Sequence, residues 1–341
     1  MLSFFVQSFF ILSFCSTTAF SSTRLSRRGD QIPQFVKDFA PLVFLDKNEK
    51  YYPSDIAKHI ENTTPFVNKT AINPSPSITV ENLDLLNQFN VNETKVYLTL
   101  KEPVENNPTF LLGTQPDENG KTVDATSCVV IVKDHGDGNV DAFYMYFYSF
   151  DKGNVVLSQE LGNHVGDWEH TMVRFKSGSP EALWLSQHAY GQAFSYGAMK
   201  KQGDRAIVYS ATGTHANYAT DGDHDHTIPG VTLPKGLLVD HTSEGKLWDP
   251  VKSANFYTFD PASNTINAVD SSPVGIMNFK GRWGDAEYSG NSHGQQSFFG
   301  FKKYVDGPTG PLDKDLNRKN ICPDRIQNCD IKNEIGAQPK T

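Results

Sequence analysis

The sequence predicts an all-β fold, namely a β-sandwich with long polar loops and one or two short helices. Of its 341 residues, 12% are aromatic, and the chain also contains 26 Gly and 19 Pro. Aromatic side chains favour strands, whereas Gly and Pro favour turns. Short strand-like segments separated by turn residues are typical of a sandwich. The hydrophobic content of 38% is enough for a large core and excludes a disordered chain.

The N-terminus has the pattern of a secretory signal. Residues 4–14 form an apolar run that small residues follow. Such a run is too short to span a bilayer, so we predict a signal peptide over 1–19, with a buried apolar helix as the alternative. Residues 20–35 are predicted to be a flexible lead or pro-segment, in which Arg27-Arg28 is a hypothetical processing site. No transmembrane segment is expected in the mature chain.

The sequons and cysteines agree with a secretory route. Asn62, Asn68 and Asn92 each begin an N-x-S/T sequon, which accepts a glycan only in that pathway. Cys322 and Cys329 are close enough in sequence to pair in an oxidising compartment. We therefore predict a glycoprotein with one disulfide bond.

The elements follow from local patterns along the chain. Residues 53–60 predict a short helix capped by Ser54, and 80–86 predict a second. Beyond residue 94, alternating or continuous apolar residues predict strands. In the strand 140–150, Phe and Met side chains take one face and Tyr side chains the other. The expected strands are 95–100, 128–132, 140–150, 168–175, 182–187, 192–196, 206–210 and 255–259.

One sandwich domain is expected over residues 36–305. The stretches 213–234 and 281–296 are rich in Gly, Asp, His and Asn, and are predicted to be functional loops. Residues 306–341 are polar and contain three prolines, so we predict an extended C-terminal tail that the cysteine pair holds in place.

The segment 163–170 gives the sharpest chemical signal. Because strand side chains alternate, Asp167 and Glu169 share one face, and His164 can fold back over them. Asp151, at the end of the preceding strand, is a possible fourth ligand. Oxygen-rich donors favour Ca²⁺, Mg²⁺ or Mn²⁺ over structural zinc. The alternative is a solvated strand face with ordinary charges.

A second polar cluster begins at His215 and Asn217 and continues through Asp221 and Asp223. Its aspartates resemble the start of a calcium loop, but the later EF-hand positions do not match. It is therefore either another cation site, a third wall of the first site, or a polar surface loop. His188 and the pair 240–241 are interpreted as structural.

The net charge of the chain and the lack of several known catalytic motifs argue against some classes of function. The net charge of −8 argues against nucleic-acid binding. The sequence lacks a G-x-S-x-G elbow, a P-loop and an H-E-x-x-H motif. A metal-dependent hydrolase, with His215 or His164 as general base, remains the alternative to a non-enzymatic binding protein.

Six segments, at 39–43, 52–55, 166–169, 213–218, 247–250 and 281–285, run in order across residues 36–290. Through these segments the chain resembles the vacuolar protein sorting-associated protein 62 family, which implies a role in protein targeting to the vacuole. Together with the predicted secretory signal, this gives an expected location that is secreted or in the vacuolar lumen.

Residues 163–169 are also similar to the G-H-R-H-D-W-E heptapeptide of necrosis- and ethylene-inducing-like proteins. That resemblance implies a secreted β-sandwich in which His164, Asp167 and Glu169 bind a divalent cation, with Asp151 as a further ligand. Asn163, Val165 and Gly166 depart from the heptapeptide, so cytolytic activity is not assumed for this chain. The expected ligand is a glycan, a glycolipid head group or a cargo protein.

Overall fold

The computed structural model describes residues 32–90, 95–226, 234–290 and 292–336. The predicted signal peptide, the Arg27-Arg28 pair and Asn92 lie outside these ranges.

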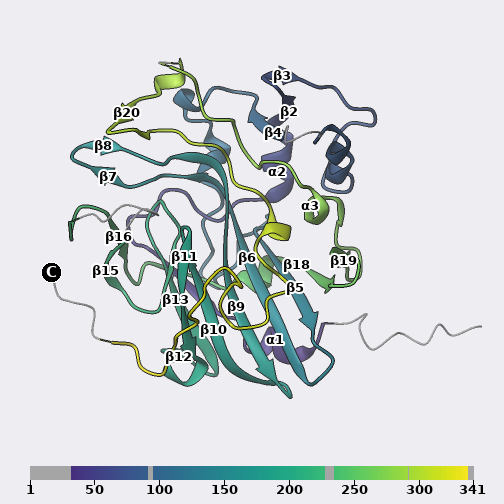
Figure 1. Cartoon of the computed structure of the whole chain (residues 1–341), viewed down its shortest axis with the longest axis vertical. Helices are drawn as coiled ribbons and strands as arrows, with labels where there is room; N and C mark the ends of the chain where they lie inside the picture. The colour runs from purple at the N-terminus through teal and green to yellow at the C-terminus, as the bar shows by residue number, and fades with distance from the viewer. Residues whose placement is uncertain (1–31, 91–94, 227–233, 291, 337–341) are drawn as a thin grey trace, which may run out of the picture.

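A twisted eight-stranded sheet forms the centre of the molecule, in the order β19-β18-β5-β6-β9-β10-β11-β22 (Figure 1). Its strands are β5 (Cys128–Asp134), β6 (Asn139–Asp151), β9 (His164–Lys176), β10 (Ser179–Gln187), β11 (Tyr190–Ser195), β18 (Ala254–Asp260), β19 (Thr265–Ala268) and β22 (Ile331–Lys332).

Strands β6 and β9 are the longest and pair antiparallel along their whole length. The alternation predicted for β6 is confirmed. Phe143, Met145 and Phe147 belong to one buried cluster, and the tyrosines at 144, 146 and 148 belong to another on the opposite face. Both faces of the central sheet are therefore buried, which explains why its strands are apolar on both sides.

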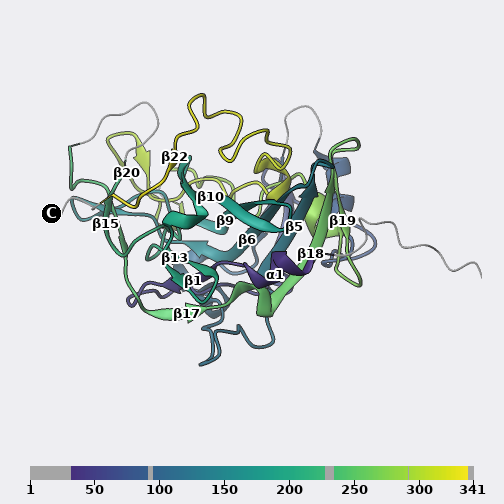
Figure 2. The ribbon, with the colours of Figure 1, turned by 90° about the horizontal axis from the view of Figure 1, so that it is seen from below.

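A smaller sheet covers the tyrosine face and completes the predicted sandwich. Its order is β12-β13-β1-β17, and β14 pairs with β13 beside that path. Val43, Val208 and Trp248 of this sheet pack against the tyrosines of β6. Figure 2 shows β1, β13 and β17 below the central strands. The strands are β1 (Leu42–Leu45), β12 (Lys201–Gln202), β13 (Arg205–Ser210), β14 (Asn217–Tyr218) and β17 (Lys246–Trp248).

The other face of the central sheet is covered by helices and a small sheet. Trp168 points into this layer, where its ring centroid lies 5.2 Å from that of Trp283. The three-stranded sheet contains β2 (Thr63–Val67), β3 (Thr70–Ala71) and β4 (Val96–Leu100). The α-helices of the described ranges are α1 (Gln34–Asp38), α2 (Ile56–Glu61) and α3 (Gly275–Asn278). The 3₁₀ helices there are Leu83–Phe89, Val104–Asn106, Thr109–Leu112, Tyr196–Ala198, Pro250–Ser253, Ser292–Gly294 and Pro311–Asp313.

Three hairpins project at one edge of the molecule (Figure 1). Two of them have two-residue turns, Leu157-Ser158 and Phe299-Gly300, with positive φ at both positions, as type I′ turns require. The hairpins are β7 (Val155–Val156) with β8 (Gln159–Glu160), β15 (Gly222–Asp225) with β16 (Val239–Thr242), and β20 (Ser297–Phe298) with β21 (Phe301–Lys302).

Two local predictions need correction. Helix α2 is capped by Asp55, which accepts a hydrogen bond from Lys58 N, whereas Ser54 Oγ accepts one from Ser149 N. The second predicted helix is a 3₁₀ helix and lies further along the chain, at Leu83–Phe89.

The C-terminal segment also differs from the predicted extended tail. Leu316, Arg318 and Ile321 are buried, and β22 joins the central sheet by pairing parallel with β11. The Arg318 guanidinium lies 4.9 Å from the Phe143 ring centroid. Scattered apolar residues in a polar segment give no periodic signal, so the burial of this segment was not predictable.

The predicted Cys322–Cys329 disulfide is present, with the two Cα atoms 5.5 Å apart, and Cys128 is a buried free thiol.

Candidate functional site

The ladder between β6 and β9 builds the first part of the site. Asp151, the last residue of β6, is the direct partner of His164, the first residue of β9. Gly166 follows with φ +69°, and its carbonyl oxygen lies 2.7 Å from His164 Nδ1. This left-handed residue lets the start of β9 turn so that His164 folds back beside the carboxylates, as the sequence predicted.

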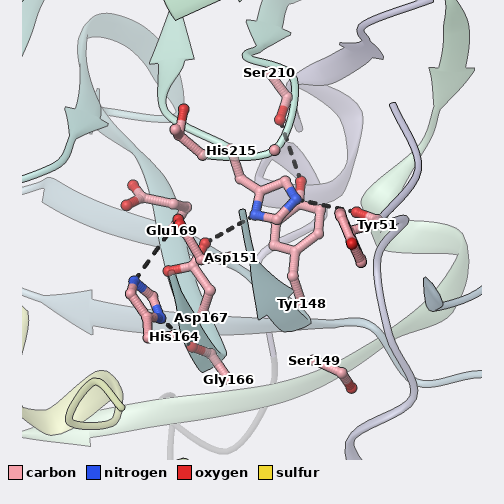
Figure 3. A network of polar contacts seen from close by, with 12 residues as sticks. Tyr51, Tyr148, Ser149, Asp151, His164, Gly166, Asp167, Glu169, Ser210 and His215 are labelled. Carbon is pink, nitrogen blue, oxygen red and sulfur yellow. Dashed lines mark hydrogen bonds and ion pairs between the residues drawn. The ribbon is translucent and has the colours of Figure 1, made fainter. Parts of the chain in front are cut away.

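Asp151, Asp167 and Glu169 form a buried carboxylate cluster on the face toward the small sheet. Their exposed fractions are 6%, 5% and 7%. Figure 3 shows the three side chains gathered beside His164. Ser186 Oγ donates to Glu169 Oε2, and His215 bonds to Asp167. Among the described residues, none donates a hydrogen bond to Asp151, and the imidazole Nε2 of His164 lies 3.7 Å from its carboxylate. A buried carboxylate without a donor is unfavourable unless a positive charge approaches it.

His215 reaches the cluster from the turn between β13 and β14. Its Nδ1 lies 3.0 Å from Asp167 Oδ2, and its Nε2 lies 3.0 Å from the Tyr51 carbonyl oxygen. Its ring stacks on Tyr148 at a centroid distance of 3.6 Å. A carbonyl oxygen only accepts, so Nε2 carries a proton, and Nδ1 faces a carboxylate. The arrangement therefore suits a doubly protonated His215 that acts as a counter-charge to Asp167 (Figure 3).

Burial and neighbouring charges shift the pKa values of the three carboxyl groups. Burial and the charges of Asp167 and Glu169 raise the pKa of Asp151 well above its usual range. Burial and the charge of Asp167 raise the pKa of Glu169 to about 7. Burial also acts to raise the pKa of Asp167, but the hydrogen bond with His215 and the charges of His164 and His215 lower it overall.

The histidines shift in opposite directions. Burial lowers the pKa of His164. Burial acts in the same direction on His215, but the hydrogen bond with Asp167 and the charges of Glu49 and Asp167 raise its pKa overall.

The loop residues that were candidate cation ligands lie in two different places in the structure. His215 belongs to the site, and buried Asn217 lies next to it, with its Nδ2 3.5 Å from Ser186 Oγ. Asn217 Oδ1 has no hydrogen-bond partner within the described part of the chain. Asp221 and Asp223 instead lie exposed near the β15–β16 hairpin, where Asp223 pairs with His241. The hairpin carries these aspartates away from the carboxylates, so they do not form a wall of the first site.

Several residues of the site were not predicted. Ser186 of β10 approaches Glu169 because the two strands are neighbours in the sheet. Glu49 Oε2 lies 3.9 Å from His215 Nε2 and comes from a distant part of the sequence. The sequence did contain a signal for Ser186, because the polar residues Ser186 and Gln187 end the otherwise apolar strand predicted at 182–187. No local pattern indicated that Glu49 would reach the site.

A cavity of about 480 Å³ opens beside the cluster. Asp151 and His164 line its polar part, and Leu161, Phe298 and Phe301 line its apolar part. Hydrogen bonds from Gly162 N and Asn163 N to the carbonyls of Lys302 and Lys303 hold the β20–β21 hairpin against this wall.

Sequence comparison assigns the chain to a family. Residues 15–286 match the family described as "Vacuolar protein sorting-associated protein 62". The chain belongs to this family. The resemblance predicted from the sequence is therefore confirmed, and it supports a role related to vacuolar protein sorting.

Two relatives come from Saccharomyces cerevisiae. TDA6, which carries the name "Putative vacuolar protein sorting-associated protein", is 35% identical over 338 residues, covering 90% of this chain and 72% of that protein. Vacuolar protein sorting-associated protein 62 is 34% identical over 328 residues, covering 87% of this chain and 69% of that protein.

Among solved structures, the chain is similar to NLPPya in complex with glucosamine, at 13% identity and a TM-score of 0.29, covering 55% of this chain and 67% of that one. It is also similar to Necrosis and Ethylene inducing Protein 2 from the causal agent of cocoa's Witches Broom disease. That match has 13% identity and a TM-score of 0.29, covering 58% of this chain and 72% of that one. Scores this low carry no argument about ligand or activity.

The helices in the described part of the chain are all too short or too polar to cross a bilayer. Of the predicted glycosylation sites, Asn68 is exposed at the β2–β3 turn and Asn62 is half-buried at the end of α2. Glycosylation and the signal peptide stay predictions, as does the choice between a secreted and a vacuolar location.

Proposed function

We propose that this protein is a divalent-cation-dependent binding module of the vacuolar sorting family. The observation that carries this proposal is the Asp151 carboxylate, which is buried beside Asp167 and Glu169 and accepts no hydrogen bond from the described residues. Three carboxylates this close repel one another when ionised. His215 already bonds to Asp167, so it does not offset the charge of the other two carboxylates. A bound cation would supply the missing positive charge.

The donor set fits a hard cation. Carboxylate oxygens suit Ca²⁺, Mg²⁺ or Mn²⁺, which prefer oxygen ligands. Asn217, whose amide nitrogen lies next to Ser186, has an amide oxygen with no hydrogen-bond partner among the described residues and is a further oxygen donor in this region. His164 adds one imidazole at the edge of the cluster. Because Asp151 and His164 line the cavity, a cation held there would also face a ligand that enters it. Hydroxyl or phosphate oxygens on that ligand would complete the coordination shell.

The rim of the cavity favours a glycolipid head group over a free glycan or a cargo protein. Leu157 and Phe299, both lining residues, are 67% and 85% exposed at the tips of their hairpins. A lipid would give these apolar side chains an environment that water does not. The two hairpin tips therefore supply the apolar contact, and the cation supplies the polar one.

The hydrolase alternative is less well supported. A general base needs a free nitrogen within hydrogen-bond reach of its proton donor. Both His215 nitrogens already have acceptors as neighbours, and the side chain is fully buried. His215 is therefore better suited to hold Asp167 in place than to activate water.

The test begins with calorimetric titration of Ca²⁺, Mg²⁺ and Mn²⁺ into metal-stripped protein. Wild type should bind one of these ions saturably, and Asp151→Asn should not. Asp221→Asn is the matched control, because that exposed aspartate lies outside the cluster. The same three proteins are then mixed with vesicles that contain or lack glycolipid. Cation-dependent sedimentation with glycolipid vesicles alone supports the proposal, whereas the absence of cation binding by wild type rejects it.

A further inference from the structure

A second cluster of metal-binding side chains lies outside the carboxylate site. His188 Nε2 lies 2.7 Å from Asp240 Oδ2, and His226 Nε2 lies 3.5 Å from Asp240 Oδ1. One donor atom from each of the three residues lies within 4.8 Å of the others. His188 lies in the β10–β11 turn, His226 directly follows β15, and Asp240 lies in β16, so only the folded chain brings them together.

Asp240 is held rigidly at the base of this cluster. Its side chain is fully buried, and it accepts hydrogen bonds from Thr214 Oγ1 at 2.9 Å and Tyr218 OH at 2.7 Å. Asn154 Nδ2 donates to its Oδ1 at 3.1 Å. Polar neighbours that fix the orientation of a carboxylate are the usual support of a metal ligand in proteins.

The two histidines are placed at the surface of the cavity. His188 has a left-handed backbone, with φ +52°, in the two-residue turn that joins β10 to β11. Such a conformation is unfavourable for a residue with a side chain and persists where the surroundings hold it. The His188 and His226 rings stack at 4.2 Å, so both present Nε2 toward the same carboxylate. Both side chains line the cavity that Asp151 and His164 also line.

We propose that His188, His226 and Asp240 form a second metal site, which binds a transition-metal ion of the zinc type. Two imidazoles with one carboxylate are a common ligand set for Zn²⁺ with an open position and for related divalent ions. Ligand atoms around tetrahedral zinc lie on the order of 3.3 Å apart. The His226–Asp240 separation of 3.5 Å is close to this value, whereas the His188–Asp240 contact of 2.7 Å is a hydrogen bond that a bound ion would replace. The fourth position would face the cavity, where water or a ligand can bind.

This site differs from the carboxylate cluster in its chemistry. The first cluster is rich in oxygen donors and suits a hard ion, whereas the second has two nitrogen donors and suits a softer one. The inference does not rest on the proposed function, because each site has its own ligands and its own preferred ion. Two ions facing one cavity would allow both to contact a single bound ligand.

Zinc titration of metal-stripped protein, prepared without a polyhistidine tag, tests the second site. Wild type should bind one Zn²⁺ at this site, and His188→Gln and His226→Gln should each weaken that binding by more than about tenfold. Co²⁺ is a second probe, because imidazole coordination gives visible absorption bands that both variants should lose. Asp151→Asn should keep these bands.

His241→Gln is the matched control. His241 neighbours Asp240 in the same strand and pairs with Asp223 at 2.6 Å, but both side chains are about half exposed. This variant should bind Zn²⁺ and Co²⁺ as wild type does. Unfolding midpoints in chelator would show that each variant is folded. The proposal is overturned if wild type binds no zinc, or if the His188 and His226 variants bind it as tightly as wild type.

Discussion

His164 Nε2 lies 3.7 Å from Asp151 Oδ2, because the two residues are direct partners in the β6–β9 ladder. This distance is too long for a hydrogen bond. The pairing therefore brings an imidazole to the carboxylate without satisfying it. The position between them is the part of the site where an added cation would have the largest effect.

Asp151→Asn should make the protein more stable in chelator but insensitive to cation. Removing one charge relieves the repulsion with Asp167 and Glu169, so we expect a gain of about 1–2 kcal/mol in the free energy of unfolding. Saturating Ca²⁺ should stabilise wild type through binding to the folded state and leave the variant unchanged. Urea unfolding with and without Ca²⁺ measures both effects. Asp221→Asn should behave as wild type, and a variant less stable than wild type in chelator would contradict the expectation.

His215→Ala should be strongly destabilising even without any ligand. The change removes a hydrogen bond to a buried carboxylate and the stacking on Tyr148, and leaves Asp167 without its counter-charge. We expect a loss of about 3 kcal/mol or more in urea unfolding. His241→Ala is the control, since that side chain is exposed and should change stability by less than about 0.5 kcal/mol. Similar losses in the two variants would show that His215 does not hold the site together.

Protonation of His59 should contribute to acid destabilisation. His59 is fully buried in contact with Ser149 and the Trp283 carbonyl, and burial lowers its pKa from 6.5 to about 4. Because the folded-state pKa lies below the unfolded value, this contribution is complete above pH 6.5. It is lost as the pH falls from 6.5 to 4. The loss amounts to about 3 kcal/mol.

Urea unfolding of wild type and His59→Gln at several pH values between 7 and 4 measures the contribution of His59 to the free energy of unfolding. The variant should lose about 3 kcal/mol less stability than wild type over that interval. Other buried histidines, such as His170, contribute equally to both proteins. Parallel pH profiles would show that His59 is not the group responsible.

Strand alternation was the reliable part of the sequence interpretation. It predicted that Asp167 and Glu169 share a face and that Trp168 points the other way, and the structure has this arrangement. Antiparallel pairing of two neighbouring strands then brings Asp151 to His164. These relationships depend on local geometry, which a single sequence contains.

Contacts made by loops could not be predicted in the same way. Glu49 and the Tyr51 carbonyl approach His215 only because β1 packs next to β13 in the small sheet. His188, at the end of a predicted strand, and the pair 240–241 were interpreted as structural, yet folding places His188 and Asp240 2.7 Å apart. Such meetings depend on the tertiary arrangement, for which residue spacing carries no signal.

Gly166→Ala should disturb the start of β9 and with it the carboxylate site. Gly166 has φ +69°, and an added Cβ would lie 2.3 Å from the Trp283 carbonyl oxygen, so the start of β9 would have to move away. Gly162→Ala is the matched control, since Gly162 has φ +88° and open space around the same position. Gly162→Ala should therefore lose only the backbone term of about 1 kcal/mol, whereas Gly166→Ala should lose about 3 kcal/mol. Because His164 is fixed by the Gly166 carbonyl, Gly166→Ala should also weaken cation binding in calorimetry. Equal stability losses in the two variants would show that the close approach to Trp283 does not position the site.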